Sequence, residues 1–150
     1  MRIAFDLDDT LISSKPNFLI QNSVCQIIAR MFHVEHLRKN TTEIFHFCQK
    51  NNIETWVYTT SFRSKIYIYF LFLLNRINLQ GIVNQNVHAK KVKCKATKYP
   101  PAFGIDLLVD DSEGVRIEGK KYGFDVLCIK PDDKDWIEKI KQKIVEKKPL

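Results

Sequence analysis

The chain alternates short apolar runs with segments of helical periodicity, and this alternation restricts its fold more than any other feature of the sequence. The runs have the length and the β-branched and aromatic content typical of strands. They occupy residues 2–7, 53–58, 81–85, 105–109 and 124–129, of which 81–85 is the least apolar. Helical patterns separate and follow them, at residues 20–31, 40–48, 63–76, 112–121 and 134–148. This order predicts an α/β fold, a doubly wound, Rossmann-like parallel sheet of about five strands with helices on both faces.

The length and composition fit a single domain with a core of its own. The 150 residues include 45% hydrophobic and 27% charged side chains, which is ordinary globular usage and far from the composition of disordered chains. The pattern shows no internal repeat, low-complexity tract or linker. We therefore predict one domain over residues 1–150.

The cysteines and the apolar segments indicate a cytoplasmic protein that does not enter a membrane. The four cysteines stand far apart, without the spacing of a metal site, which is typical of a reduced chain; they are Cys25, Cys48, Cys94 and Cys128. The amino-terminal apolar stretch is too short for a signal peptide. The most apolar run, residues 66–74, is shorter than the ~20 residues that span a bilayer. We expect this aromatic helix to be buried or to form the surface of a homodimer.

Basic residues are in excess and unevenly distributed. Lysine and arginine exceed aspartate and glutamate by 24 to 17, and residues 88–98 contain five lysines and no acid. A lysine-rich surface attracts phosphate-bearing ligands and anionic macromolecules. A solvated lysine surface without a partner is the alternative.

Acidic and hydroxyl side chains follow the apolar runs, at the points where the strands should end. They are Asp6, Asp8, Asp9, Thr59, Thr60, Asp110 and Asp111. The carboxyl ends of parallel strands meet at one edge of the sheet, where α/β proteins bind ligands. Clustered carboxylates repel one another unless a cation lies among them, and carboxylate oxygens suit Mg²⁺. A metal, a lysine and hydroxyls together stabilise the oxygens of a phosphoryl group.

Four of these segments resemble, in order, the motifs of the haloacid dehalogenase-like (HAD) hydrolases. DLDDTL at residues 6–11 matches the DxDx[TV] first motif, and WVYTTS at 56–61 resembles the second. KYPP at 98–101 offers the lysine of the third motif, and LLVDDS at 107–112 is similar to the acidic fourth. The resemblance covers nearly the whole chain. Because the gaps between the motifs leave little room for a cap domain, it implies a minimal-cap phosphatase with an open site, of a kind that often acts on large substrates.

The resemblance also implies roles for the carboxylates. Asp6 would be the nucleophile and form an aspartyl-phosphate. Asp8 would act as general acid and then as general base, as in the phosphatase members. The side chains of Asp6, Asp111 and Asp110, with the backbone carbonyl of Asp8, would hold Mg²⁺. Asp9 is expected to be a solvated turn residue.

For the phosphate, the resemblance implies one hydroxyl and one ammonium group. Thr59 would donate a hydrogen bond to a phosphoryl oxygen, and Thr60 is the alternative if the strand ends one residue later. Lys98, two residues before a pair of prolines, would neutralise charge between nucleophile and phosphate. Four other lysines compete for this role, namely Lys90, Lys91, Lys93 and Lys95.

Other interpretations remain open at this point. VDDS alone also resembles the acidic pair of a phospho-signalling receiver, although a receiver carries that pair at its first strand. A HAD-like scaffold that binds phosphate without turnover is a further alternative. Arg63 is expected to be a surface residue in the first turn of a helix, with contact to the substrate phosphate as the alternative. His33 and His36 have a spacing that a metal site could use.

Overall fold

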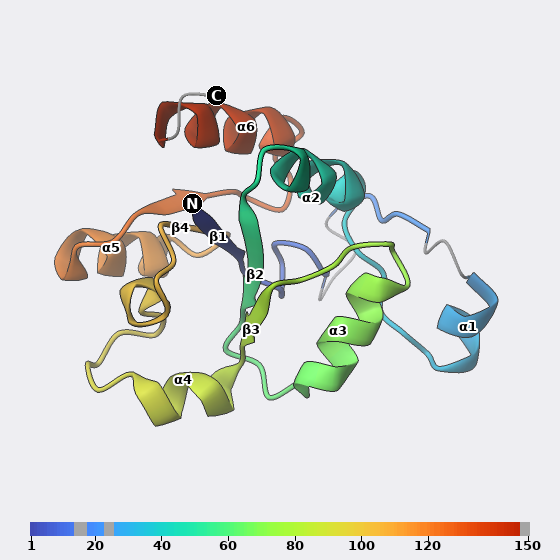
Figure 1. Cartoon of the computed structure of the whole chain (residues 1–150), viewed down its shortest axis with the longest axis horizontal. Helices are drawn as coiled ribbons and strands as arrows, with labels where there is room; N and C mark the ends of the chain where they lie inside the picture. Colours follow the sequence, from blue (N-terminus) through green and yellow to red (C-terminus); the bar gives the residue numbers. More distant parts are fainter. Residues whose placement is uncertain (14–17, 23–25, 148–150) are drawn as a thin grey trace.

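A five-stranded parallel sheet with strand order β3-β2-β1-β4-β5 forms the centre of the computed structural model (Figure 1). The strands are β1 (Arg2–Phe5), β2 (Glu54–Tyr58), β3 (Gly81–Val83), β4 (Leu107–Asp110) and β5 (Val126–Cys128). The structure describes residues 1–13, 18–22 and 26–147. The five strands and the helices between them confirm the predicted α/β, Rossmann-like fold class.

Helices cover both faces of this sheet. They are α1 (Gln26–Met31), α2 (Thr41–Lys50), α3 (Lys65–Leu73), α4 (Gln85–Lys91), the 3-10 helix η1 (Pro100–Phe103), α5 (Glu113–Tyr122) and α6 (Trp136–Lys147). Buried side chains of α2, α3 and α6 pack on one face, and those of η1 and α5 pack on the other. Figure 1 shows α2 and α6 side by side along one edge of the view and α4 and α5 on the opposite side of the strands.

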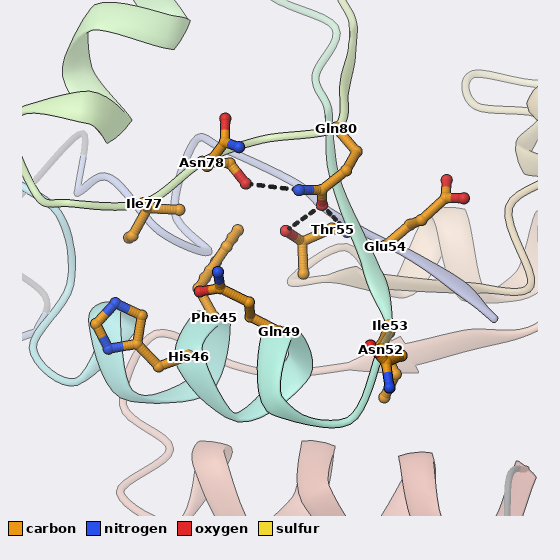
Figure 2. A pocket seen from close by; sticks show the side chains of 10 residues that line it. All are labelled: Phe45, His46, Gln49, Asn52, Ile53, Glu54, Thr55, Ile77, Asn78 and Gln80. Atoms are coloured by element: carbon orange, nitrogen blue, oxygen red, sulfur yellow. Dashed lines mark hydrogen bonds between the residues drawn. The ribbon is translucent and has the colours of Figure 1, made fainter.

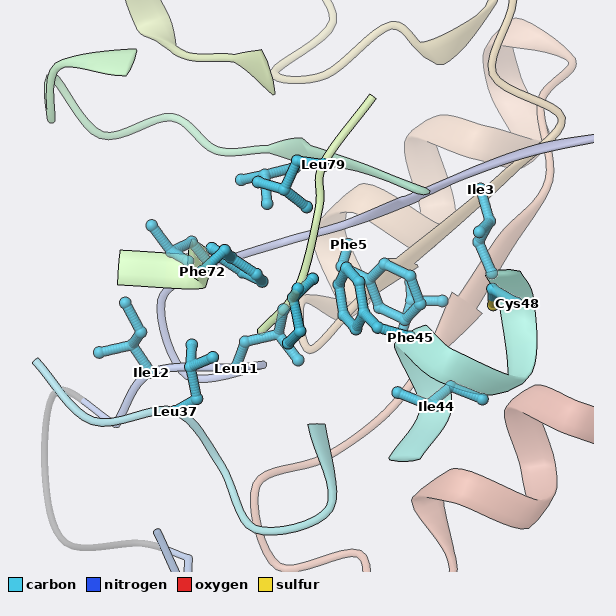
Figure 3. Close-up of a cluster of buried hydrophobic side chains, with 14 of the residues drawn as sticks. Ile3, Phe5, Leu11, Ile12, Leu37, Ile44, Phe45, Cys48, Phe72 and Leu79 are labelled. Carbon is cyan, nitrogen blue, oxygen red and sulfur yellow. The ribbon is translucent and has the colours of Figure 1, made fainter. Parts of the chain in front are cut away.

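The two faces are built by alternate residues of each strand, as the period of two in a strand requires. On β1, Ile3 and Phe5 face the larger core, whereas Ala4 faces the smaller one. In the larger core the ring of Phe45 lies 4.7 Å from that of Phe5 and 5.4 Å from that of Phe72, measured between centroids (Figure 3). These aromatic contacts fix α2 and α3 against the central strand.

Several predicted helix boundaries are wrong, and each has a local cause. The predicted helix at 20–31 is helical only from residue 26 in the described chain, because Ile20 instead forms an isolated bridge with Arg38. Val24 and Cys25 lie outside the described residues. The predicted helix at 40–48 begins one residue later, at Thr41, because Asn40 adopts a φ of 70°, outside the helical region.

Helix α4 was not predicted, because residue 85 was assigned to the strand at 81–85 and residues 88–91 to the lysine-rich segment. The side chain of Asn84 accepts a hydrogen bond of 3.1 Å from the backbone N–H of Val87, which is a typical helix N-cap. Asn84 was therefore the available signal. As a result, the gap between the second and third motifs holds two helices and one strand, and not one helix and one strand as predicted.

None of the helices in the described part of the chain combines the length and the apolar character needed to cross a membrane. Three cysteines within this part, Cys48, Cys94 and Cys128, are free thiols.

We expect Gly119→Ala to destabilise the fold, because α5 packs on β5 through this glycine. An added Cβ would lie 2.7 Å from the carbonyl oxygen of Phe124 and 2.9 Å from a methyl group of Val126. We predict a loss of about 1–3 kcal/mol in the free energy of unfolding, measured by urea denaturation.

Gly114→Ala is the matched control in the same helix. Its added Cβ would meet no atom closer than the hydroxyl of Ser112 at 3.4 Å, so that only the higher helix propensity of alanine acts, with a gain of up to about 1 kcal/mol. Equal effects of the two substitutions would show that the close packing of Gly119 is unimportant.

Candidate functional site

Three carboxylates meet where β1 and β4 end. Asp6 directly follows β1, and its backbone N–H donates a hydrogen bond of 2.8 Å to the carbonyl of Val109 on the neighbouring β4. Asp110 is the last residue of β4, and Asp111 follows it. One oxygen from each of the three carboxylates lies within 4.8 Å of the others. The parallel pairing of two strands thus brings together residues about a hundred positions apart.

Lys98 provides the positive charge inside this group. Its side chain is 4% exposed, and its ammonium group donates hydrogen bonds to Asp6 Oδ1 and to Asp110 Oδ2, the latter at 2.6 Å. The four competing lysines, Lys90, Lys91, Lys93 and Lys95, are all exposed. Of the five, Lys98 is the one that the structure places among the carboxylates.

A hydrogen-bonded chain from β2 fixes the segment that carries Lys98. The backbone N–H of Tyr99 donates to the hydroxyl of Tyr58 at 2.9 Å, and this hydroxyl lies 2.6 Å from Nδ1 of His88 on α4. All three groups lie in or beside the smaller core. The position of the lysine is therefore set by the sheet and by α4.

Burial and mutual repulsion change the acidity of the group. Burial raises the pKa of Asp6 to about 7; the ammonium of Lys98 opposes this rise, and the charge of Asp110 adds to it. Burial and the charge of Asp110 also raise the pKa of Asp111. Burial lowers the pKa of Lys98, but its contacts with Asp6 and Asp110 outweigh this effect and leave the pKa above its ordinary value. The carboxylates thus carry more negative charge than one lysine compensates.

The donor set fits a hard divalent cation. Carboxylate and hydroxyl oxygens are the ligands that Mg²⁺ prefers. The hydroxyl of Thr10 lies 3.4 Å from Asp6 Oδ2 and 3.5 Å from Asp111 Oδ1. Both oxygens of Asp110 already accept hydrogen bonds. Oδ2 accepts one from Lys98, and Oδ1 accepts one of 2.9 Å from the backbone N–H of Ser112. Asp6 and Asp111 therefore have the oxygens best able to hold a metal, with Asp110 beside them.

Asp9, between Asp8 and Thr10 in the sequence, has a backbone φ of 60°. This value lies in the left-handed region, which aspartate enters more readily than most residues. Its N–H donates to the carbonyl of Ile12 at 2.6 Å. The turn reverses the chain directly after β1 and ends the strand at Phe5, two residues earlier than predicted. It also brings Thr10 back beside Asp6.

Asp8 and Thr59 lie together beside this group. The hydroxyl of Thr59 is 3.4 Å from Asp8 Oδ2, and its backbone N–H donates to the carbonyl of Val83 at 2.9 Å. Thr59 is buried, whereas Thr60 is exposed to solvent. The hydroxyl of the following Ser61 is also buried and lacks a hydrogen-bond partner among the described residues. Of the two threonines, Thr59 is the one next to a predicted catalytic carboxylate.

Arg63 does not lie where it was predicted, and Glu35 was not predicted as a site residue. Arg63 precedes the cap residue Ser64, so that it lies outside the first turn of α3. Its side chain is 25% exposed, and its Nη1 lies 2.8 Å from Asp8 Oδ1. Glu35, from the segment between α1 and α2, accepts two further hydrogen bonds from the same guanidinium group. A basic residue soon after a strand end was a usable signal for Arg63, but nothing local in the sequence indicated Glu35.

The metal site considered for His33 and His36 does not appear in the described structure, where the group of side chains close enough to hold an ion consists of the three aspartates. A cavity of about 280 Å³ lies at the opposite end of β2, between that strand, α2 and the segment before β3 (Figure 2). Two of its polar side chains are paired with each other, since Gln80 accepts hydrogen bonds from Thr55, and Gln80 also donates one to the carbonyl of Asn78. None of the predicted site residues lines this cavity.

Solved structures with this architecture include HAD proteins, at low sequence identity. A chain of a Pnkp1/Rnl/Hen1 complex gives a TM-score of 0.56 at 11% identity and covers 85% of this chain, which spans only 45% of that one. The HAD domain of the effector protein Lem4 from Legionella pneumophila gives 0.56 at 15% identity over 97% and 93% of the two chains. A HAD-superfamily hydrolase from Geobacter sulfurreducens gives a TM-score of 0.54 at 14% sequence identity, and the match covers 85% of each chain. No protein-family model and no curated protein sequence matches the chain.

At such identities the likeness establishes the fold alone. The chain therefore has a HAD-like fold, as the order of its motifs predicted. The roles of the site residues remain predictions, now with a defined geometry.

We expect Lys98→Met to destabilise the protein by about 3–5 kcal/mol, because it leaves two buried carboxylates without their cation. The loss should shrink as the pH falls from about 8 to about 5. Burial raises the pKa of Asp6 from an ordinary 3.8 to about 7, and the ammonium of Lys98 holds it down at that value. Without the ammonium this pKa should rise further, so that the folded variant binds a proton over more of this pH range than the folded parent, while the unfolded chains bind none. Chemical denaturation in the presence of a chelator measures both effects.

The matched control is Lys95→Met, which changes an exposed lysine three residues away. It should alter the free energy of unfolding by no more than about 0.5 kcal/mol. A loss in the Lys98 variant that equals the control, or that does not change with pH, would contradict this account of the buried charges.

Proposed function

We propose that this chain, which has a HAD-like fold, is a Mg²⁺-dependent phosphomonoester hydrolase that acts through an aspartyl-phosphate intermediate. The observation that carries the proposal is the position of Asp6. Its carboxylate lies between Lys98 on one side and the oxygens of Thr10 and Asp111 on the other. A nucleophile for a phosphoryl group needs such flanking cations and donors, because most of phosphoryl-transfer catalysis is positioning and charge neutralisation.

In the first step, an oxygen of Asp6 attacks phosphorus, and the bond from phosphorus to the leaving oxygen breaks. Asp8 gives its proton to that oxygen, which leaves as an alcohol. In the second step, Asp8 takes a proton from a water molecule as the water oxygen attacks phosphorus, which releases phosphate and restores the Asp6 carboxylate. Lys98 and the hydroxyl of Thr59 hold phosphoryl oxygens throughout. A bound Mg²⁺, held by Asp6, Asp111, Asp110 and the carbonyl of Asp8, supplies charge neutralisation.

The substrate we propose is a large or macromolecular phosphate ester handled in the cytoplasm. Within the described residues, the elements around the site are short and include no separate cap domain. The exposed lysines of α4 and the segment after it, Lys90, Lys91, Lys93 and Lys95, form a basic surface on the same chain segment that delivers Lys98. An anionic macromolecule would be attracted to such a surface, and the attraction would weaken with added salt.

The parent protein is expected to release phosphate from p-nitrophenyl phosphate in a Mg²⁺-dependent manner. Chelation should abolish the reaction, and Asp6→Asn should reduce kcat by about 10³-fold or more, because the amide is no nucleophile. Malachite-green detection of phosphate measures this. Phosphopeptides and phosphorylated oligonucleotides, each at low and high salt, extend the assay to the proposed substrates.

Asp132→Asn, at an exposed aspartate, controls for the change of charge and should keep the parent rate. An Asp6→Asn protein as active as the parent would refute the nucleophile. A parent that binds phosphate tightly without turnover would support the non-catalytic scaffold instead.

We also propose that the chain forms a homodimer through α3. The residues of α3 that face the core are Ile68, Leu71 and Phe72. The opposite face of α3 is apolar as well, but it is exposed to solvent. The exposed fraction is 82% for Ile66 and 68% for Leu73. Tyr69, between Ile66 and Leu73 on the same face of α3, is exposed as well, and Phe62 is exposed just before the helix. A continuous exposed apolar stripe of this kind is typical of an interaction surface.

Light scattering should therefore give twice the mass of one chain, and Ile66→Glu should shift the protein to a monomer. Ile117→Glu is the matched control, because Ile117 is an isoleucine on α5 that is 57% exposed and lies outside the stripe. A strict monomer of the parent at assay concentrations would dismiss the dimer.

A further inference from the structure

Asp8 begins a chain of polar contacts that leads away from the candidate site. Nη1 of Arg63 lies 2.8 Å from Asp8 Oδ1 and 3.0 Å from Oδ2, so that it contacts both oxygens of the carboxylate. The Nε and Nη2 atoms of the same guanidinium donate to the two oxygens of Glu35, at 2.9 Å and 2.7 Å. Such a two-point contact fixes the plane of the guanidinium group as well as its position.

Glu35 is held in turn by α3. The hydroxyl of Tyr67 donates to Glu35 Oε2 at 2.9 Å and accepts a hydrogen bond of 3.2 Å from the backbone N–H of Glu35. The hydrogen bonds to Glu35 and the charges of Asp8 and Glu35 outweigh burial and raise the pKa of the Arg63 guanidinium above its ordinary value. Hydrogen bonds from Arg63 and Tyr67 outweigh the effect of burial and lower the pKa of the Glu35 carboxyl.

The backbone of Arg63 is fixed from the opposite side. Nδ2 of Asn84 donates to the carbonyl of Arg63 at 3.0 Å. Asn84 is buried at the end of β3, and its side chain also caps α4. Arg63 is thus held at its carbonyl by the sheet and at its guanidinium by Glu35, and one nitrogen remains directed at Asp8.

Structural stability alone explains this arrangement poorly. The side chains of Asp8, Arg63 and Glu35 are 39%, 25% and 34% exposed, and ion pairs as exposed as these contribute little to folding. For catalysis, in contrast, the position of Asp8 matters. A general acid acts only within hydrogen-bond distance of the atom that it protonates, and a half-exposed carboxylate without a fixed partner has several rotamers of similar energy.

We infer that Arg63, clamped by Glu35, is a positioning residue that holds the carboxylate of Asp8 where it can protonate the leaving oxygen of the substrate. This inference rests on the proposed phosphatase function. In the reaction, the proton moves from Asp8 to the leaving oxygen while the bond from that oxygen to phosphorus breaks. Arg63 itself exchanges no proton.

The experiment compares two substrates that differ in their need for an acid. The leaving group of p-nitrophenyl phosphate departs as a stable phenolate, whereas that of glycerol 2-phosphate must be protonated. The value of kcat/KM covers the steps up to the first irreversible one, in which the leaving group departs. Arg63→Gln should lower kcat/KM for glycerol 2-phosphate by about 30-fold or more, as misplacement of a general acid does, and for p-nitrophenyl phosphate by less than about 3-fold.

Graded variants test the clamp. Glu35→Gln should change the ratio of the two kcat/KM values in the same direction but less, because it weakens one link of the chain and keeps Arg63. Arg63→Lys should give an intermediate ratio, since lysine restores the charge without the two-point contact. Arg30→Gln removes an exposed arginine from α1 and should leave the ratio unchanged. Thermal melting of each variant verifies that it is folded.

Equal fold losses on both substrates would leave the ratio unchanged and show that Arg63 only supports the fold or binds phosphate. No loss on either substrate would show that it does not position Asp8. A parent that turns over the aryl ester alone would overturn the inference while leaving the proposed hydrolase intact, because Asp8 would then not act as an acid. A parent inactive on both substrates would overturn the proposed function and the inference with it.

Discussion

The contact of one buried ammonium group with two buried carboxylates is the interaction on which the site depends. Asp6 and Asp110 end neighbouring strands, and without a cation their charges could not both persist at this depth. Lys98 supplies that cation from a segment that is fixed by Tyr58 and His88. The fold around the site can therefore be understood as the framework that delivers this lysine.

The strand order explains why Asp6 is the residue at the centre. β1 lies between β2 and β4 in the sheet, so that whatever follows β1 has a strand end on each side. Thr59 comes from the end of β2, and Asp110 from the end of β4. A first strand at the edge of the sheet would have only one such neighbour, and the same motif would then lack half of its contacts. The position of the motif in the chain and the position of its strand in the sheet act together.

Most of the sheet could be predicted from the sequence, because the alternation of apolar residues that marks a strand is a local pattern. The acids at the strand ends could be predicted for the same reason. Lys98 could be separated from its neighbours through Pro100, which begins η1. The contacts among Asp8, Arg63 and Glu35 could not be predicted. They join the residues after β1 and before α3 to the segment between α1 and α2, which has no periodic pattern. Helix α4 was missed because its cap, Asn84, follows a strand of only three residues and was included in it.

The formal charges of the site explain why the proposed reaction needs a metal. The buried group contains three carboxylates, Asp6, Asp110 and Asp111, and one ammonium, Lys98. The adjoining group has two carboxylates, Asp8 and Glu35, and one guanidinium, Arg63. An anionic phosphate ester would meet an excess of negative charge in both groups, and the repulsion is greatest in the buried one because water screens it least. Under the proposed function, a divalent cation among the buried carboxylates would cancel this excess at the place where the phosphoryl group has to bind, so that metal binding and substrate binding would be coupled.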